Sequence, residues 1–183
     1  MASPAPVTAE TGDAIVVTGQ VREAGLTDAT PLSVAHPLVT GQVGYGPAGS
    51  LPDGVPEAWT WTSGAPDPAW DGTDSGLPAA DGYVATLVAP AAGTYSTAWR
   101  FTVDGGLTWA LCDLNGSDDG YAPADAGAMT TTTPDPCAPN PCTAPPGGVC
   151  NGDWLTAAAN PGVCSVVAGL ASCDYPTTDI DCA

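Results

Sequence analysis

Oxygen-bearing side chains gather in one short loop that begins at Asp113 and reads DLNGSDDG. Asp113, Asn115 and Ser117 alternate as the first three ligands of a calcium loop do, and hard cations prefer such oxygens. Asp118 and Asp119 add carboxylates, but no glycine stands at the sixth position and no Glu at the twelfth. The loop is therefore interpreted either as a calcium site or as an Asn-Gly turn joined to a solvated acidic loop.

Tryptophan is frequent, with six in the chain. Exposed coplanar indoles can stack on sugar rings, and the candidates for this role are Trp59, Trp61 and Trp70. The competing interpretation places most of the tryptophans in a hydrophobic core, where large aromatic side chains bury the most area.

Six of the seven cysteines lie between positions 137 and 182, in a segment rich in Pro and Gly. This density predicts a disulfide framework formed in an oxidising compartment. Zinc is the rival, but no C-x-x-C pair occurs and the one histidine, His36, is distant in sequence. We expect three bridges, without a chosen connectivity, among Cys137, Cys142, Cys150, Cys164, Cys173 and Cys182.

Cys112 is left over once the C-terminal cysteines pair. Its even position places it opposite Leu107, Trp109 and Leu111 on the expected strand, and hence outward. It could be free, paired to a distant segment, or bridged to a neighbouring molecule. If the protein assembles, the intermolecular bridge is the preferred outcome, and a buried, unreactive thiol is the main competitor.

Catalytic groups and basic surfaces are scarce in the sequence. His36 lies in an apolar stretch, no nucleophile elbow or phosphate-binding glycine loop is present, and we expect no enzyme activity. The 20 acidic residues outnumber two arginines, giving a net charge of −18. This charge repels nucleic acid, and no apolar run is long enough to insert into a membrane.

Alternating side chains predict the strands that would position these residues. Large residues at odd positions from Tyr95 to Val103 predict a strand, Asp104-Gly105-Gly106 a turn, and Leu107 to Leu111 the return strand. Further strands are expected over 14–21, 38–45, 57–62 and 83–89. Residues 1–13 are expected to be extended or mobile.

The predicted fold is all-β: an antiparallel β-sandwich of immunoglobulin or fibronectin III type over residues 1–129, followed by a small disulfide-stapled module. Residues 130–136, TTTTPDP, are predicted to be a linker, and residues 137–183 form the Cys-rich module. Within that module, 154–159 and 164–173 could form a short hairpin.

Several stretches resemble known modules. The segments GQVGYGPAGS, AAGTYSTAWRFTVDGGLTWALCDLNGSDDGY and AGAMT are similar to a β-sandwich module of secreted proteins of environmental bacteria, often large surface or exported hydrolases. The segment PNPCTAPPGGVCNGDWLTAAANPGVCSVVAGLASCDYPTTDIDC resembles Cys-rich modules of myxobacterial-type exported proteins. The resemblance implies an extracellular, modular character and assigns no site residue.

Together these features predict a non-catalytic extracellular or cell-surface protein with a structural or adhesive role, a self-assembling surface or filament component. Its expected partner is a further copy of itself or a surface glycan, and its expected cofactor is none or calcium. The alternative is a carbohydrate-binding accessory module of a larger secreted hydrolase. A third hypothesis is an enzyme that uses a pair of carboxylates for catalysis.

Overall fold

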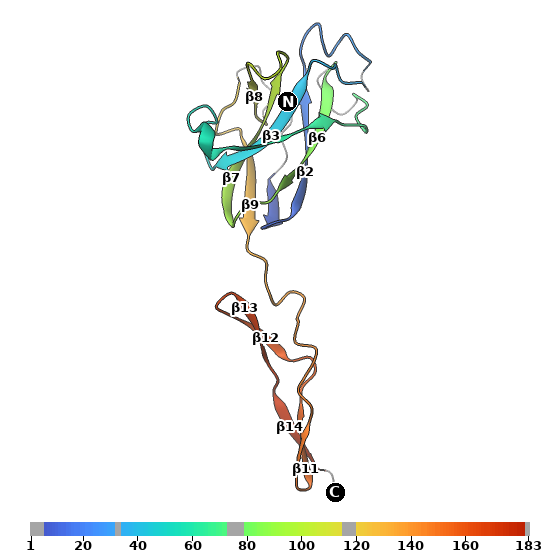
Figure 1. Cartoon of the computed structure of the whole chain (residues 1–183), viewed down its shortest axis with the longest axis vertical. Coiled ribbons are helices and arrows are strands. Elements are labelled where there is room, and N and C mark those ends of the chain that lie inside the picture. The colour runs from blue at the N-terminus through green and yellow to red at the C-terminus, as the bar shows by residue number, and fades with distance from the viewer. Residues whose placement is uncertain (1–5, 32–33, 73–78, 115–119, 182–183) are drawn as a thin grey trace. The chain divides into compact units, whose positions relative to one another are not determined.

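The computed structural model describes residues 6–31, 34–72, 79–114 and 120–181 (Figure 1). The chain divides into two units, residues 1–133 and 134–183. Apart from one short 3-10 helix at Pro56–Ala58, every regular element of the described residues is a β-strand. The all-β prediction is confirmed.

The first unit is a sandwich of two sheets. One sheet has the order β1-β9-β7-β3-β4, with β8 added to β7, and the other has the order β2-β6-β5. All pairs are antiparallel except β1 with β9. The strands are β1 Val7–Glu10, β2 Ala14–Val21, β3 Thr40–Pro47, β4 Thr60–Ser63, β5 Ala65–Pro66, β6 Asp81–Val88, β7 Gly93–Thr102, β8 Ala110–Cys112 and β9 Gly127–Thr132. An immunoglobulin or fibronectin III relationship remains a prediction.

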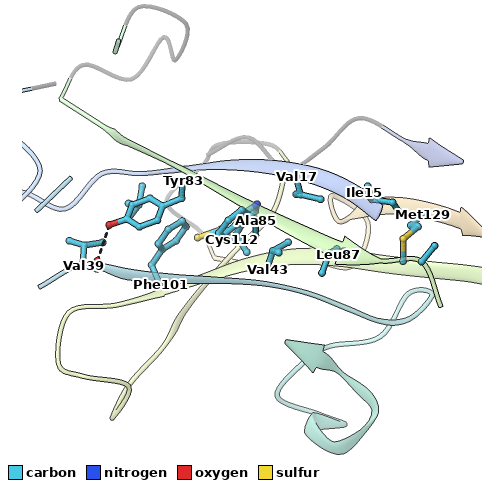
Figure 2. Packing of buried hydrophobic residues seen from close by; sticks show 13 residues of the cluster. Ile15, Val17, Val39, Val43, Tyr83, Ala85, Leu87, Phe101, Cys112 and Met129 are labelled. Atoms are coloured by element: carbon cyan, nitrogen blue, oxygen red, sulfur yellow. Dashed lines mark hydrogen bonds between the residues drawn. The ribbon is translucent and has the colours of Figure 1, made fainter. Parts of the chain in front are cut away.

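The core lies between the two sheets, where Figure 2 shows the buried side chains pointing toward one another. Trp99 of β7 lies within it at 1% exposure and donates its indole N–H to the Thr18 carbonyl at 3.1 Å. A Cβ atom at Gly19 of β2 would lie 2.6 Å from the Trp99 ring. A strand glycine therefore makes room for the largest core side chain.

The hairpin of β7 and β8 differs in register from the prediction. Trp99 pairs with Cys112, and Phe101 pairs with Ala110, so odd positions of β7 face even positions of β8. Cys112 therefore shares the buried face with Trp99, while Trp109 and Leu111 lie on the other side of the sheet. Gly105 and Gly106 of the predicted turn have the positive φ expected of them, +74° and +93°, but the connection between the strands covers residues 103–109. The predicted return strand, 107–111, therefore begins too early, and the predicted outward Cys112 is wrong because the longer connection shifts the pairing.

Asp104 determines the shape of that connection. Its Oδ1 accepts hydrogen bonds from the Thr102 hydroxyl at 2.6 Å and from the Thr108 N–H at 3.0 Å, and its Oδ2 accepts one from the Thr108 hydroxyl at 2.6 Å. These bonds, the Thr102 hydroxyl first, lower the pKa of the Asp104 carboxyl. One carboxylate thus joins the two ends of the loop, at Thr102 and Thr108, by hydrogen bonds.

The predicted linker begins too early. Residues 130–132 belong to β9, and Thr131 is 3% exposed and donates its hydroxyl to the Ala91 carbonyl at 2.6 Å. The same residues pair with β1, which lies in the N-terminal segment expected to be extended or mobile. Thr131 is buried because β9 pairs with β1 on one side and with β7 on the other, and the second unit begins at residue 134.

The second unit contains two small sheets. β10 Val149–Asn151, β11 Trp154–Ala158 and β14 Thr177–Asp181 form one sheet in the order β10-β11-β14. β12 Val163–Val167 and β13 Leu170–Asp174 pair with each other. The two segments expected to form one hairpin therefore do not pair together, because 164–173 folds into a hairpin of its own.

Two disulfides hold this hairpin to the strap Cys137–Cys142. They join Cys137 to Cys164 and Cys142 to Cys173. Cys164 and Cys173 are directly opposite each other on β12 and β13, so both bridges leave one face of the hairpin. The expected framework is confirmed for these four cysteines. Cys150 is bridged to no other described cysteine, and Cys182 lies outside the described residues.

No helix in the described part of the chain is long and apolar enough to cross a membrane.

Candidate functional site

An aromatic layer covers the outer face of the larger sheet, on the side of β3 away from the core. β3 contributes glycines to this face: a Cβ at Gly44 would lie 2.5 Å from the Trp61 ring, and a Cβ at Gly46 would collide with Trp59. The two indoles stack with ring centroids 5.4 Å apart and an interplanar angle of 20°. Because these glycines have no side chains, the flat indole rings lie directly against the β3 backbone and cover it.

Arg100 of β7 extends this layer. Its guanidinium carbon lies 4.0 Å from the Trp61 ring centroid and 4.4 Å from that of Trp109. Its Nε donates to the Gln42 side-chain oxygen at 2.9 Å. Burial lowers the pKa of Arg100, and the charge of Asp53 opposes that effect. The layer is thus bound together by cation–π contacts as well as by stacking.

A hollow of about 310 Å³ lies at the margin of the aromatic layer. It is lined by Leu51, Pro52, Asp53, Gly54, Trp109, Leu111, Gly120 and Tyr121. Ser50 fastens the overlying loop, since its hydroxyl oxygen accepts from the Trp59 indole N–H at 3.0 Å and its carbonyl accepts from the Tyr121 hydroxyl at 3.2 Å. Aromatic walls and one carboxylate suit a small polar ligand with an apolar face.

The three tryptophans predicted to stack on glycans are mostly engaged within the protein. Trp59 is 5% exposed, which leaves too little ring surface for a sugar, so its predicted role does not fit the structure. Trp61 lies in contact with Trp59 and Arg100. Trp70 is half-buried, covers Gly82, and donates its N–H to the Ala80 carbonyl at 2.9 Å. Packing within the sandwich accounts for these contacts.

The predicted calcium loop is described only in part. Asp113 is 3% exposed, and its Oδ2 accepts the backbone N–H of Ala122 at 2.8 Å. Asn115, Ser117, Asp118 and Asp119 lie outside the described residues. Among the residues that are described, no group of three or more side chains could hold a metal ion. A calcium site at this loop stays a prediction.

Cys112 is a buried thiol at 3% exposure, bonded to no other described cysteine. Its Sγ lies 3.8 Å from the Ala110 carbonyl oxygen, and burial raises the pKa of the thiol to about 12. A neutral, inaccessible thiol is a poor nucleophile and cannot reach a second molecule. The preferred prediction of an intermolecular bridge is therefore wrong because the thiol is buried, as the competing prediction had it, and the low reactivity of Cys112 stays a prediction.

Asp81 is a buried carboxylate that the sequence interpretation did not single out. It is 1% exposed, and its Oδ2 accepts the backbone N–H of His36 at 3.0 Å. Burial raises the pKa of Asp81, with the bond and charge of His36 opposing it. His36 uses its Nδ1 as an acceptor for the Leu38 N–H at 3.3 Å. The pair fastens the segment before β3 to the start of β6.

Comparison with protein-family models, curated proteins and solved structures finds no match to this chain.

Proposed function

We propose that this chain is a non-catalytic, extracellular structural or adhesive protein whose C-terminal hairpin associates with further copies of the chain. The observation that carries the proposal is the open face of β12 and β13. Val167 and Leu170 are paired across the hairpin and are 59% and 72% exposed. Val163 lies on the same face at 58% exposure, opposite the face that carries the disulfides.

The edges of the hairpin support the same role. In the described part of the chain, β12 and β13 pair only with each other, so each strand has an open edge. Unpaired strand edges and exposed apolar side chains favour pairing with another strand. The two disulfides hold the hairpin in place, which lowers the entropy cost of ordering it on association.

Charge gives this association a testable salt dependence. Every charged side chain of residues 134–183 is an aspartate, and the whole chain carries a net charge of −18. Like charges on two copies repel, and salt screens this repulsion. Self-association through the hairpin should therefore strengthen as the salt concentration rises.

Sedimentation velocity on the oxidised full chain, at low and high salt and over a range of protein concentrations, tests the proposal. The wild type should form larger species, more so in high salt, and Val167→Asp/Leu170→Asp should stay monomeric. Leu107→Asp is the matched control, because Leu107 is 85% exposed but lies in the first unit. A wild type that is monomeric under all conditions, or a double variant that assembles normally, would contradict the proposal.

Glycan binding is the second candidate function, and one observation favours it. The side chain of Trp154 in β11 is 51% exposed, in contrast to the buried Trp59. The sequence interpretation named Trp59, Trp61 and Trp70 for this role and did not consider Trp154.

A further inference from the structure

Three side chains stand side by side at one end of the β10-β11-β14 sheet. In the strand register, Asn151 of β10 pairs with Trp154 of β11, and Trp154 pairs with Asp181 of β14. Directly paired residues project from the same face, and neighbouring strands lie about 4.8 Å apart. An exposed indole is therefore flanked by an amide on one side and a carboxylate on the other.

The next row of the same face holds two polar side chains and one exposed valine. Val149, Thr156 and Asp179 are paired across the three strands. The Thr156 hydroxyl donates to Asp179 Oδ1 at 2.6 Å, which fixes that carboxylate beside the Trp154 row. The opposite face carries Cys150, Leu155 and Ile180, so polar groups and the indole share one face.

A tight turn holds the first row in place. Only Gly152 and Asp153 connect Asn151 to Trp154, and Gly152 has a φ of +65°. A positive φ at the first central residue is the requirement of a type II′ hairpin turn, which glycine meets without strain. The amide and the indole are therefore presented by adjacent, paired residues, with little ordering left to do on binding.

We infer that the row Asn151–Trp154–Asp181, hereafter the indole row, is a binding site for the pyranose rings of a neutral or amino-sugar polysaccharide. The flat C–H face of a pyranose is apolar and matches the indole face. Its equatorial hydroxyl or ammonium groups donate to the carboxylates of Asp179 and Asp181, and hydrogen bonds to charged acceptors are strong. The Asn151 amide supplies both a donor and an acceptor.

Charge selects among polysaccharides. The residues around the indole row include aspartates and no basic side chain, and residues 134–183 contain no Lys or Arg. Uronic-acid and sulfated polymers would be repelled. The inference names a ligand class and a site for the second candidate function, and it requires no self-association.

Affinity electrophoresis of the oxidised full chain through gels containing a soluble neutral β-glucan, chitosan oligomers or alginate tests the inference. The wild type should be retarded by the glucan or by chitosan, and the two arms separate neutral from cationic sugars. Retardation by both the glucan and chitosan would indicate that the pyranose ring face, which the two polymers share, is what the site binds. Retardation by neither, or retardation by alginate equal to that by the other polymers, overturns the proposal.

Variants locate the binding. Trp154→Ala should weaken binding at least about tenfold, because an exposed tryptophan at the centre of a site contributes strongly. Trp154→Leu should lose binding as well, since it keeps apolar area but no flat ring, and Trp154→Tyr should retain part of it. Asp179→Asn should weaken chitosan binding more than glucan binding. Wild-type affinity in both Trp154→Ala and Trp154→Leu would refute the site.

Two controls separate this result from the fate of the assembly proposal. Unreduced peptide mapping should show the Cys137–Cys164 and Cys142–Cys173 bridges intact in each variant, which establishes that the strap and the β12–β13 hairpin are joined as in the wild type. Val167→Asp/Leu170→Asp should bind glycans normally, and Trp154→Ala should sediment as the wild type does. Glycan binding lost in the hairpin variant but kept in Trp154→Ala would assign it to the hairpin instead.

Discussion

The hydroxyl of Tyr83 is a polar group within the core, and removing it gives a sharp test of the structure. Tyr83 is 1% exposed and donates to the Val39 carbonyl at 2.8 Å (Figure 2). Its ring packs edge-on against Phe101 with centroids 5.3 Å apart. Tyr83→Phe keeps the ring and removes the hydroxyl donor. The carbonyl of Val39, a residue that is 4% exposed, then loses this hydrogen bond.

The size of the effect follows from the cost of an unpaired buried acceptor, about 1–3 kcal/mol. For the unit of residues 1–133, the entropy of unfolding is about 0.28 kcal/mol/K by the usual per-residue value. Tyr83→Phe should therefore lower Tm by about 4–11 °C near neutral pH. Near-UV circular dichroism, which reports the aromatic core, provides the measurement.

The loss of stability at alkaline pH gives a second measurement, and its direction follows from the pKa of Tyr83. Burial, and next the charge of Asp81, raise the pKa of Tyr83 from 10.0 to about 12. Between these two values the folded state keeps the Tyr83 proton, whereas the unfolded state releases it. The contribution of the protonated Tyr83 to the stability of the fold is therefore fully present below pH 10 and is lost as pH rises through about 12. The chain has no lysine, so tyrosines and thiols dominate this range, and a Cys112→Ala background removes the buried thiol.

In that background, the parent should lose stability between about pH 10 and 12 more steeply than Tyr83→Phe does. The gap between the two Tm values should therefore narrow with rising pH. Equal Tm values at neutral pH would mean that the Tyr83–Val39 bond does not exist in solution. A gap that stays constant to pH 12 would refute the raised pKa.

Three further predictions test other parts of the first unit. Gly44→Ala should destabilise it by about 1–3 kcal/mol, because the added Cβ meets the Trp61 ring, whereas Gly54→Ala, whose nearest atoms lie at 3.5 Å and beyond, should be far milder in chemical denaturation. Because the pKa of the folded Asp104 is lowered, its carboxylate stabilises the folded state above the ordinary value of 3.8, and this stabilisation is lost as pH falls. Asp104→Asn should therefore lose stability less steeply than the wild type on acidification, and an equally steep loss would contradict this. Cys112 should resist thiol reagents in the folded protein and react after denaturation, and rapid native labelling monitored by mass spectrometry would show that the core is open there.

The sequence by itself determined several strands of the first unit, because the two-residue alternation of large side chains reports which face of a strand is buried. The range predicted for β2, 14–21, is the range observed, and Ile15, Val17 and Val21 are all buried. The density of cysteine likewise predicted a disulfide framework. Both signals are local, since they depend on the side chains of one segment and not on its neighbours.

Pairing between segments was decided only by the tertiary structure. Six cysteines allow fifteen connectivities, and spacing does not distinguish them. The observed bridges follow from the register of β12 with β13, which sets Cys164 opposite Cys173 and within reach of one strap. In the same way, Thr131 is buried because β1, distant in sequence, lies alongside β9.

The β7–β8 connection shows the physical reason most directly. Alternation predicts which residues share a face within one strand, but the length and shape of the connecting loop set how two strands align. Asp104 shapes a loop longer than a tight turn, and the resulting shift moves Cys112 into the core and Trp109 onto Arg100. Thus the sequence determined which residues of β7 share a face, whereas the loop contacts made in three dimensions determined which side chains of β8 the core contains.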